Sequence, residues 1–195
     1  MDCPYHSLPE TSWWNKAVSQ LSAEQINPHL PSDLLITRQT GIGSAGSCFA
    51  QHISKALRAK GYNFLVTEDA PIGMSPEQAG RFGYGVFSAR YGNIYTTLQL
   101  RQLLERAISA RQVADQFWTS PEGRVYDLLR PRITPNGFSS IAEARADSQR
   151  HLAAVRRVIE TADVFIFTLG LTESWISKVD GTAYPTCPGC GRSLV

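Results

Sequence analysis

One cysteine stands in a context that favours thiol chemistry. The segment GSAGSCFAQHI, residues 43–53, runs through small residues to Cys48, and a segment with helical apolar spacing follows at once. The N-terminus of a helix lowers the pKa of a thiol, and its amide N–H groups can stabilise an oxyanion. The pattern therefore predicts a nucleophile at Cys48. The alternative is a small buried cysteine at a strand end, the commoner state of free cysteine in proteins.

Ser47, the preceding residue, is a second candidate nucleophile. A hydroxyl depends on a general base more strongly than a thiol does. A small turn or N-cap residue is at least as good an interpretation of Ser47. We therefore expect Cys48, rather than Ser47, to carry the chemistry.

If the chain acts alone, a general base has to come from its four histidines. His52 follows Cys48 by four residues on the same helical face. That direction runs down the helix and away from the strand end, so we expect His52 to face solvent. We expect His151 to make a packing or hydrogen-bonding contact, whereas His6 and His29 lie in irregular, proline-flanked segments.

The elements around Cys48 are predicted to be a strand, a helix and a second strand. An extended glycine-rich run leads to Cys48, and the helix that follows ends with Gly61 as its C-cap. Its apolar face is expected to hold Phe49, Ile53, Ala56 and Leu57. The segment YNFLVTE, 62–68, follows as a strand, and a strand–helix–strand unit favours parallel pairing.

Other segments of the first half are also predicted. Apolar spacing indicates a short N-terminal helix, with a stripe of Trp14, Val18 and Leu21. Residues 69–95 are expected to form a long structured loop with a short strand near Val86 and Phe87. Residues 96–110 (TTLQLRQLLERAISA) predict a helix.

The second half predicts a helix, a strand and a hairpin. The helix opens with a capping box from Ser140 to Glu143. Its buried stripe is expected to hold Leu152, Val155, Ile159 and Ala162. The continuous apolar run DVFIFTLG, 163–170, is typical of a strand buried on both faces. Asp180-Gly181 then favours a type I′ hairpin turn.

The composition limits the class of protein. With 195 residues and 43% hydrophobic content, the chain resembles one globular domain. We expect a single domain over 1–195, with a helical extension (1–32) packed on it and an irregular tail (187–195). A net charge of +2 lacks the basic excess of a nucleic-acid binder. Without a signal-peptide pattern or a run of membrane-spanning length, a cytoplasmic protein without membrane contact is expected.

The four cysteines are too few and too unevenly spread for a disulfide framework. Cys187 and Cys190, in CPGC, have the spacing of a zinc or redox pair. However, a zinc ribbon needs a second pair at suitable spacing, and a thioredoxin-type pair should open a helix. A redox role is therefore the least supported hypothesis, and no metal site is expected.

Alternating strands and helices predict an α/β fold, with a three-layer α/β/α sandwich around a mainly parallel sheet. Sites in such sheets lie beyond the carboxyl ends of the strands. Cys48, the loop around Asn93 and the segment GLTES (170–174) all fall at such ends. We expect these three segments to meet.

Several polar residues in these segments have two interpretations. Asn93 either donates its side-chain amide to an oxyanion or lies in a left-handed turn. Thr172 and Glu173 either orient a substrate or cap a turn. Tyr95 and Arg90 either extend the site or pack within the loop.

The residues GSCFA, 46–50, are the signature of the GSCFA domain family. The chain is similar to that family through three more segments: SARYGNIYT (88–96), RADSQRHLAAVR (145–156) and DVFIFTLGLTESW (163–175). The family resembles a branch of the SGNH (GDSL-type, flavodoxin-like) esterases and acyltransferases, which are α/β/α sandwiches.

That resemblance implies roles for individual residues. In the SGNH superfamily, a first sequence block, Gly-Asp-Ser, holds the nucleophile in its third position, and this position falls on Cys48. A second block supplies an oxyanion glycine, and this position falls on Gly92. The third block, Gly-x-Asn-Asp, is similar to Gly170 through Glu173, with Thr172 in place of the oxyanion asparagine. The fourth block, Asp-x-x-His, carries the catalytic base and has no match in the chain. The resemblance therefore implies a domain truncated or frame-shifted at its C-terminus.

Two functions follow as hypotheses. In the first, the chain is an SGNH-type acyl esterase or acyltransferase in which Cys48 attacks a small-molecule or saccharide acyl ester. In the second, it is an inactive or truncated domain that binds a carbohydrate or acyl group. Neither function requires a cofactor. The sequence predicts neither the natural substrate nor the oligomeric state.

Overall fold

The computed structural model describes residues 5–27 and 33–188, and the chain divides into two units, 1–36 and 37–195. The first unit contains a 3₁₀ turn, η1 (Glu10–Ser12), and a π-helical turn, η2 (Asn15–Ser19). The short helix expected here is present as these two helical turns, but the predicted stripe is not buried, because neither turn holds a buried residue and Trp14 is 72% exposed. Packing of this unit on the rest of the chain stays a prediction.

The centre of the second unit is the strand β1 (Ile42–Gly46), which is buried along its whole length. On one edge it pairs in parallel with β4 (Val164–Thr168), in a register that sets Gly46 opposite Thr168. On the other edge, Ile42 exchanges backbone hydrogen bonds with Asn63 and Leu65. The expected strand over 62–68 is reduced to a single parallel bridge at Phe64, but its direction agrees with the expectation.

The small residues of β1 allow its neighbours to approach closely. A Cβ on Gly43 would lie 2.9 Å from Val158 Cγ1 and 3.0 Å from Phe165 Cδ2. At Gly46, φ is +147° and a Cβ would overlap the Thr168 hydroxyl. Glycine at positions 43 and 46 is therefore required by packing, because a side chain at either position would displace the helix that contains Val158 or the strand β4.

The helix α1 (Cys48–Ala59) begins at the cysteine, as expected, and Gly61 follows its C-cap with a φ of +72°. Its buried face holds Ala50 and Ser54 rather than the predicted face. Phe49 is 63% exposed, because the small Ala50 turns inward where α1 crosses the sheet. The Ser54 hydroxyl donates to the Val86 carbonyl, so this buried polar group is satisfied.

Two other helices agree with the expected ranges. The helix α3 (Thr97–Ser109) is capped by a capping box between Thr96 and Gln99. At the start of α4 (Ile141–Thr161), the Ser140 side chain accepts a hydrogen bond from the Glu143 amide, as expected. The Glu143 carboxylate accepts from the Ser139 amide and not from the amide of Ser140, so the second bond of the capping box is replaced. The predicted stripe of α4 is shifted, because its buried face also holds the polar residues Asp147, Ser148 and His151. The apolar residues buried with them are Ala144, Ala154, Val155 and Val158.

Several short elements differ from the expectations. The long loop contains a helix, α2 (Pro76–Arg81), and no described strand lies at Val86 or Phe87. Two strands, β2 (Phe117–Thr119) and β3 (Val125–Asp127), form a hairpin that was not predicted. The strands β5 (Trp175–Ile176) and β6 (Ala183–Tyr184) form the expected hairpin. Its loop spans 177–182 instead of a two-residue turn at Asp180-Gly181, and the Ser177 N–H donates to the Thr182 carbonyl across the base of this loop.

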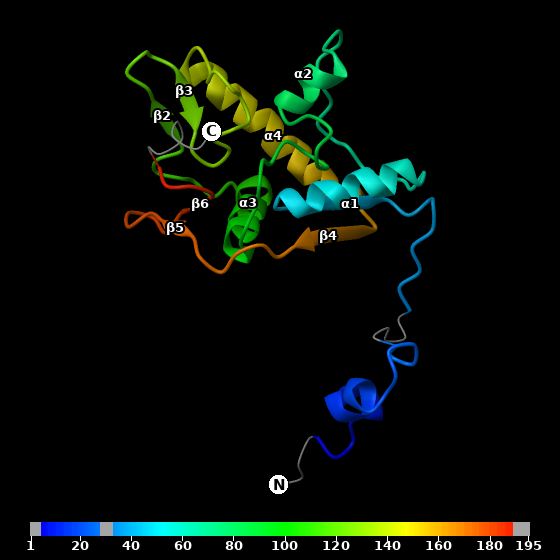
Figure 1. Cartoon of the computed structure of the whole chain (residues 1–195). Helices are drawn as coiled ribbons and strands as arrows, with labels where there is room; N and C mark the ends of the chain where they lie inside the picture. The colour runs from blue at the N-terminus through cyan, green and yellow to red at the C-terminus, as the bar shows by residue number, and fades with distance from the viewer. Residues whose placement is uncertain (1–4, 28–32, 189–195) are drawn as a thin grey trace. The chain divides into compact units, whose positions relative to one another are not determined.

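The described chain is a mixed α/β structure with one parallel pair and two small antiparallel hairpins. Figure 1 shows α1 close to β4, and the β5–β6 hairpin beside α3. The prediction that β4 is fully buried on both faces was wrong. Each of its residues is half-buried, and Phe165 and Phe167 pack against the core. No helix in the described ranges is long and apolar enough to cross a membrane.

We predict that Gly46→Ala destabilises the chain by about 2–4 kcal/mol, because strain at positive φ adds to the overlap with Thr168. Gly123→Ala is the matched control, since Gly123 has a φ of +78° with open space at its Cβ position. This control should cost only about 1 kcal/mol. Denaturant unfolding followed by circular dichroism measures both values, and equal costs would contradict the close approach.

Candidate functional site

The first part of the candidate site is the junction between β1 and α1. Ser47 occupies the N-cap position, its amide N–H donates to the Thr168 hydroxyl at 3.3 Å, and its side chain makes no capping bond. Cys48 is the first residue of α1, is exposed and forms no disulfide. The first amide N–H groups of a helix have no partner within it and carry a partial positive charge. A group bound beside Cys48 therefore meets hydrogen-bond donors.

The loop that holds Asn93 forms the second part. The Ile94 amide donates to the Gly46 carbonyl at 2.8 Å, which ties this loop to the end of β1. Asn93 accepts a 3.5 Å hydrogen bond from Gln51 Nε2 and donates to the Tyr95 hydroxyl at 3.0 Å. Gln51 follows Cys48 by three residues, so the two share a face of α1. These contacts place the Asn93 side chain beside Gln51, one turn along α1 from Cys48.

The third part is the segment after β4. The amides of Gly170 and Leu171 both donate to the Tyr95 carbonyl, at 3.2 and 3.0 Å. A Cβ on Gly170 would lie 3.3 Å from Ser47 Cβ, so this backbone runs directly beside Ser47. The three segments expected to meet at the carboxyl ends of the strands therefore do meet, with hydrogen bonds between them.

Asn93 is not a left-handed turn residue, and the polar residues after Gly170 are exposed. The left-handed conformation belongs to Gly92, with a φ of +69°, and not to Asn93. Thr172 and Glu173 are both exposed, and neither takes part in a described hydrogen bond with Ser47, Cys48 or Asn93. Glu173 instead lines a separate depression with Tyr95 and Trp175.

No histidine in the described part of the chain is hydrogen-bonded to Cys48. His52 is exposed on α1, as expected. His151 is 1% exposed and makes the expected hydrogen bond, with Nδ1 at 2.7 Å from Glu68 Oε2. His6 is exposed in the N-terminal unit, and His29 lies outside the described residues. No described histidine is hydrogen-bonded to the residues around Cys48.

A cavity of about 410 Å³ adjoins the candidate site. Its lining includes Gln51, Gly92, Asn93 and Tyr95 from the segments described above. Small-molecule sites commonly have volumes of about 300–1,000 Å³. The cavity is thus large enough for a small ligand that reaches the first turn of α1.

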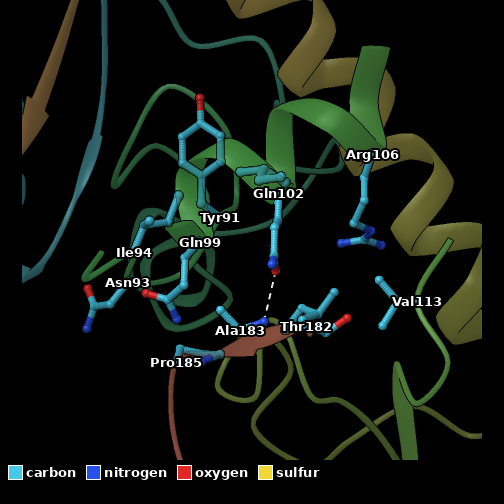
Figure 2. Close-up of a pocket in the computed structure, with 12 residues that line it drawn as sticks. Tyr91, Asn93, Ile94, Gln99, Gln102, Arg106, Val113, Thr182, Ala183 and Pro185 are labelled. Carbon is cyan, nitrogen blue, oxygen red and sulfur yellow. Dashed lines mark hydrogen bonds between the residues drawn. The ribbon is translucent and has the colours of Figure 1, made fainter. Parts of the chain in front are cut away.

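A second, much smaller cavity of about 40 Å³ lies between α3 and β6. Figure 2 shows the Gln102 side chain reaching β6, where its Oε1 accepts a hydrogen bond from the Ala183 amide at 2.8 Å. Gln102 Nε2 also donates to the Gly181 carbonyl, so the hairpin is fixed to α3. This volume holds a few waters at most, and we assign the cavity to packing rather than to substrate binding.

A buried network of charges lies behind the site and was not predicted. The Arg90 guanidinium donates to Asp147 Oδ1 at 2.8 Å, and Arg130 donates to Asp147 Oδ2 at the same distance. Arg130 also pairs with Asp127, and the Arg90 amide donates to Glu68. Tyr95 and Arg90 therefore have different roles. Tyr95 lies at the candidate site, whereas Arg90 holds the loop to α4.

One signal in the sequence could have indicated this network. Asp147 and His151 are four residues apart, on the same face as the small residues Ala144 and Ala154. Polar groups within a stripe of small buried residues need buried partners. The identity of those partners, however, depends on tertiary contacts.

The network shifts the titration of its members. Burial lowers the pKa of His151 to about 4, and the positive charge of Arg130 acts in the same direction. Burial raises the pKa of Glu68, but the contacts with His151, the Arg90 amide and the charge of Arg130 together outweigh burial, so the pKa lies below its usual value. For Asp147, the charges of Arg130 and Arg90 outweigh burial and lower the pKa. His151 is therefore neutral at pH 7 and donates from Nδ1 to an ionised Glu68.

No cluster of histidine, cysteine and acidic side chains able to hold a metal ion occurs among the described residues. Of the CPGC cysteines, Cys187 is half-buried, whereas Cys190 lies outside the described ranges. The geometry around Cys48 is instead that of an exposed thiol beside amide donors. This arrangement suits nucleophilic attack on a carbonyl group.

Comparison with known families agrees with the position of this site. The model of the GSCFA family matches residues 41–193, which include every segment of the candidate site. The chain therefore belongs to the GSCFA family. Searches of curated proteins and of solved structures gave no match.

We predict that the stability of the chain falls by about 2 kcal/mol between pH 7 and pH 5 through His151 alone. Its folded-state pKa of about 4 lies below the ordinary 6.5, so the unfolded chain binds more protons over this range. His151→Gln should remove most of this loss, as measured by denaturant unfolding at both pH values. His52→Gln, at an exposed position, should keep the wild-type pH dependence. An unchanged pH dependence in His151→Gln would refute a buried neutral imidazole.

Proposed function

We propose that this GSCFA-family chain is an SGNH-like acyl esterase or acyltransferase, with Cys48 as its nucleophile. The observation that carries the proposal is the exposed thiol at the first position of α1, with the Asn93 loop and the Gly170 segment hydrogen-bonded around that junction. The proposed substrate is an acyl ester of a small molecule or a saccharide. This chemistry calls for no cofactor.

The proposed reaction follows from the groups at hand. The thiol first loses its proton to solvent, and the thiolate then attacks the ester carbonyl carbon, so a C–S bond forms and the carbonyl becomes an oxyanion. The amide N–H of Cys48 and the side-chain amide of Asn93 are proposed to stabilise this oxyanion, with Gly92 allowing the turn that presents Asn93. Collapse breaks the C–O bond, and the departing alcohol takes a proton from water.

A thioester on Cys48 remains after this step. Attack by water releases a carboxylic acid and restores the thiol, whereas attack by an acceptor hydroxyl transfers the acyl group. Thr172 and Glu173 are proposed to contact the alcohol portion, because their segment leaves the site directly after Gly170. We also propose that β1, β4 and the strand-like residues 63–65 form the middle of an α/β/α sandwich. The hydrogen bonds on both edges of β1 support this arrangement.

A second function has its own supporting observation. None of the described histidines is hydrogen-bonded to the residues around Cys48, while a cavity of about 410 Å³ adjoins them. A binding module for an acyl or carbohydrate group would need the cavity and not the base. Loss of hydrolysis together with retained ligand binding would favour this function.

Hydrolysis of 4-nitrophenyl acetate distinguishes the two functions. We predict that Cys48→Ala lowers kcat/KM at least about 100-fold, because the nucleophile is lost. Ser47→Ala should change the rate less than about threefold, since Ser47 lies beside the site without attacking. Cys187→Ala is the matched control, because it removes another thiol and should leave the rate unchanged. Equal rates for wild type and Cys48→Ala would rule out Cys48 as the nucleophile.

A further inference from the structure

The 410 Å³ cavity has a chemical character that points to one class of ligand. Gln51, from its lining, shares a helical face with Cys48 and lies one turn away. Side chains three residues apart on a helix have Cβ atoms about 5–6 Å apart. A molecule in the cavity can therefore place one end near the thiol while its body occupies the cavity.

Part of the cavity lining is apolar. It comes from the loop before Asn93 and from the segment after β3, and its members are Val86, Phe87, Leu129, Pro131 and Ile133. Apolar lining of this extent favours a ligand with a hydrocarbon body.

The charged side chains described in the cavity lining are all positive. Arg81, Arg130 and Arg132 line the cavity, and the described lining residues include no carboxylate. Arg130 is 4% exposed, and its Nη1 has no hydrogen-bond partner among the described residues, although its other nitrogens pair with Asp127 and Asp147. Arg81, the last residue of α2, is exposed and makes no described ion pair. An anion in the cavity would thus meet the positive charge of Arg81, whereas the charge of Arg130 is shared with Asp127 and Asp147.

We propose that the cavity binds an acyl group that carries an anion at the end remote from its ester, as in the half ester of a dicarboxylic acid. The hydrocarbon body lies against Phe87 and Ile133, and the anion pairs with Arg81. The assignment of this molecule as the substrate rests on the proposed function, whereas the binding preference rests on the cavity alone.

The test compares three probes by isothermal titration calorimetry. Monomethyl adipate carries one carboxylate, dimethyl adipate is its neutral counterpart, and hexyl phosphate carries a phosphate on a similar chain. Wild type should bind monomethyl adipate at least about tenfold more tightly than dimethyl adipate. Tighter binding of hexyl phosphate would identify phosphate as the preferred anion and still support the anionic cavity.

Variants separate the role of Arg81 from the overall charge of the chain. Arg81→Gln should bring monomethyl adipate to the affinity of dimethyl adipate, whereas Arg81→Lys should keep most of the preference. Arg145→Gln removes the same charge from an exposed position on α4, outside this cavity, and should bind as wild type does.

The outcomes distinguish this inference from the proposed function. Equal affinity of wild type for the two adipate esters, or no binding of either, would overturn the anionic cavity, as would an unchanged preference in Arg81→Gln. A preference that depends on Arg81, without hydrolysis of 4-nitrophenyl acetate, would support the anionic cavity and contradict the esterase.

Discussion

The close approach of β1 to β4 at Gly46 is the constraint on which the site depends. Because Gly46 has no side chain, Thr168 packs directly against its backbone, and the Thr168 hydroxyl accepts a hydrogen bond from the next amide. The Gly46 carbonyl accepts from Ile94 on the opposite edge. One residue thus joins three segments of the chain, and α1 begins two residues later with Cys48 exposed.

The buried charge network provides the second support for this site. Arg90 lies three residues before Asn93 and is held by Asp147 of α4 and by Glu68. The loop is therefore fixed on one side of Asn93 by an ion pair and on the other by the Ile94–Gly46 bond. Breaking a buried pair leaves an uncompensated charge, which is costly. The network thus keeps the loop in one position, and this suits a site that requires preorganised donors.

The sequence predicts the elements better than it predicts their contacts. The strand–helix junction at Cys48, the helices over 97–109 and 141–161 and the meeting of three segments are confirmed, because they depend on local patterns and parallel strand order. The inward face of α1 was wrong, since a small Ala50 is preferred where the helix meets the sheet. The partners of Arg90 were unpredictable because they come from segments 22 and 57 residues away.

The central claim is that Cys48 forms a covalent bond to the acyl group. Mass spectrometry of the chain after brief reaction with 4-nitrophenyl acetate, followed by peptide mapping, tests this claim most directly. We predict one added acetyl group on the peptide that contains Cys48, and its loss on treatment with hydroxylamine at neutral pH. Labelling confined to other residues, or equal labelling of all thiols, would contradict the account.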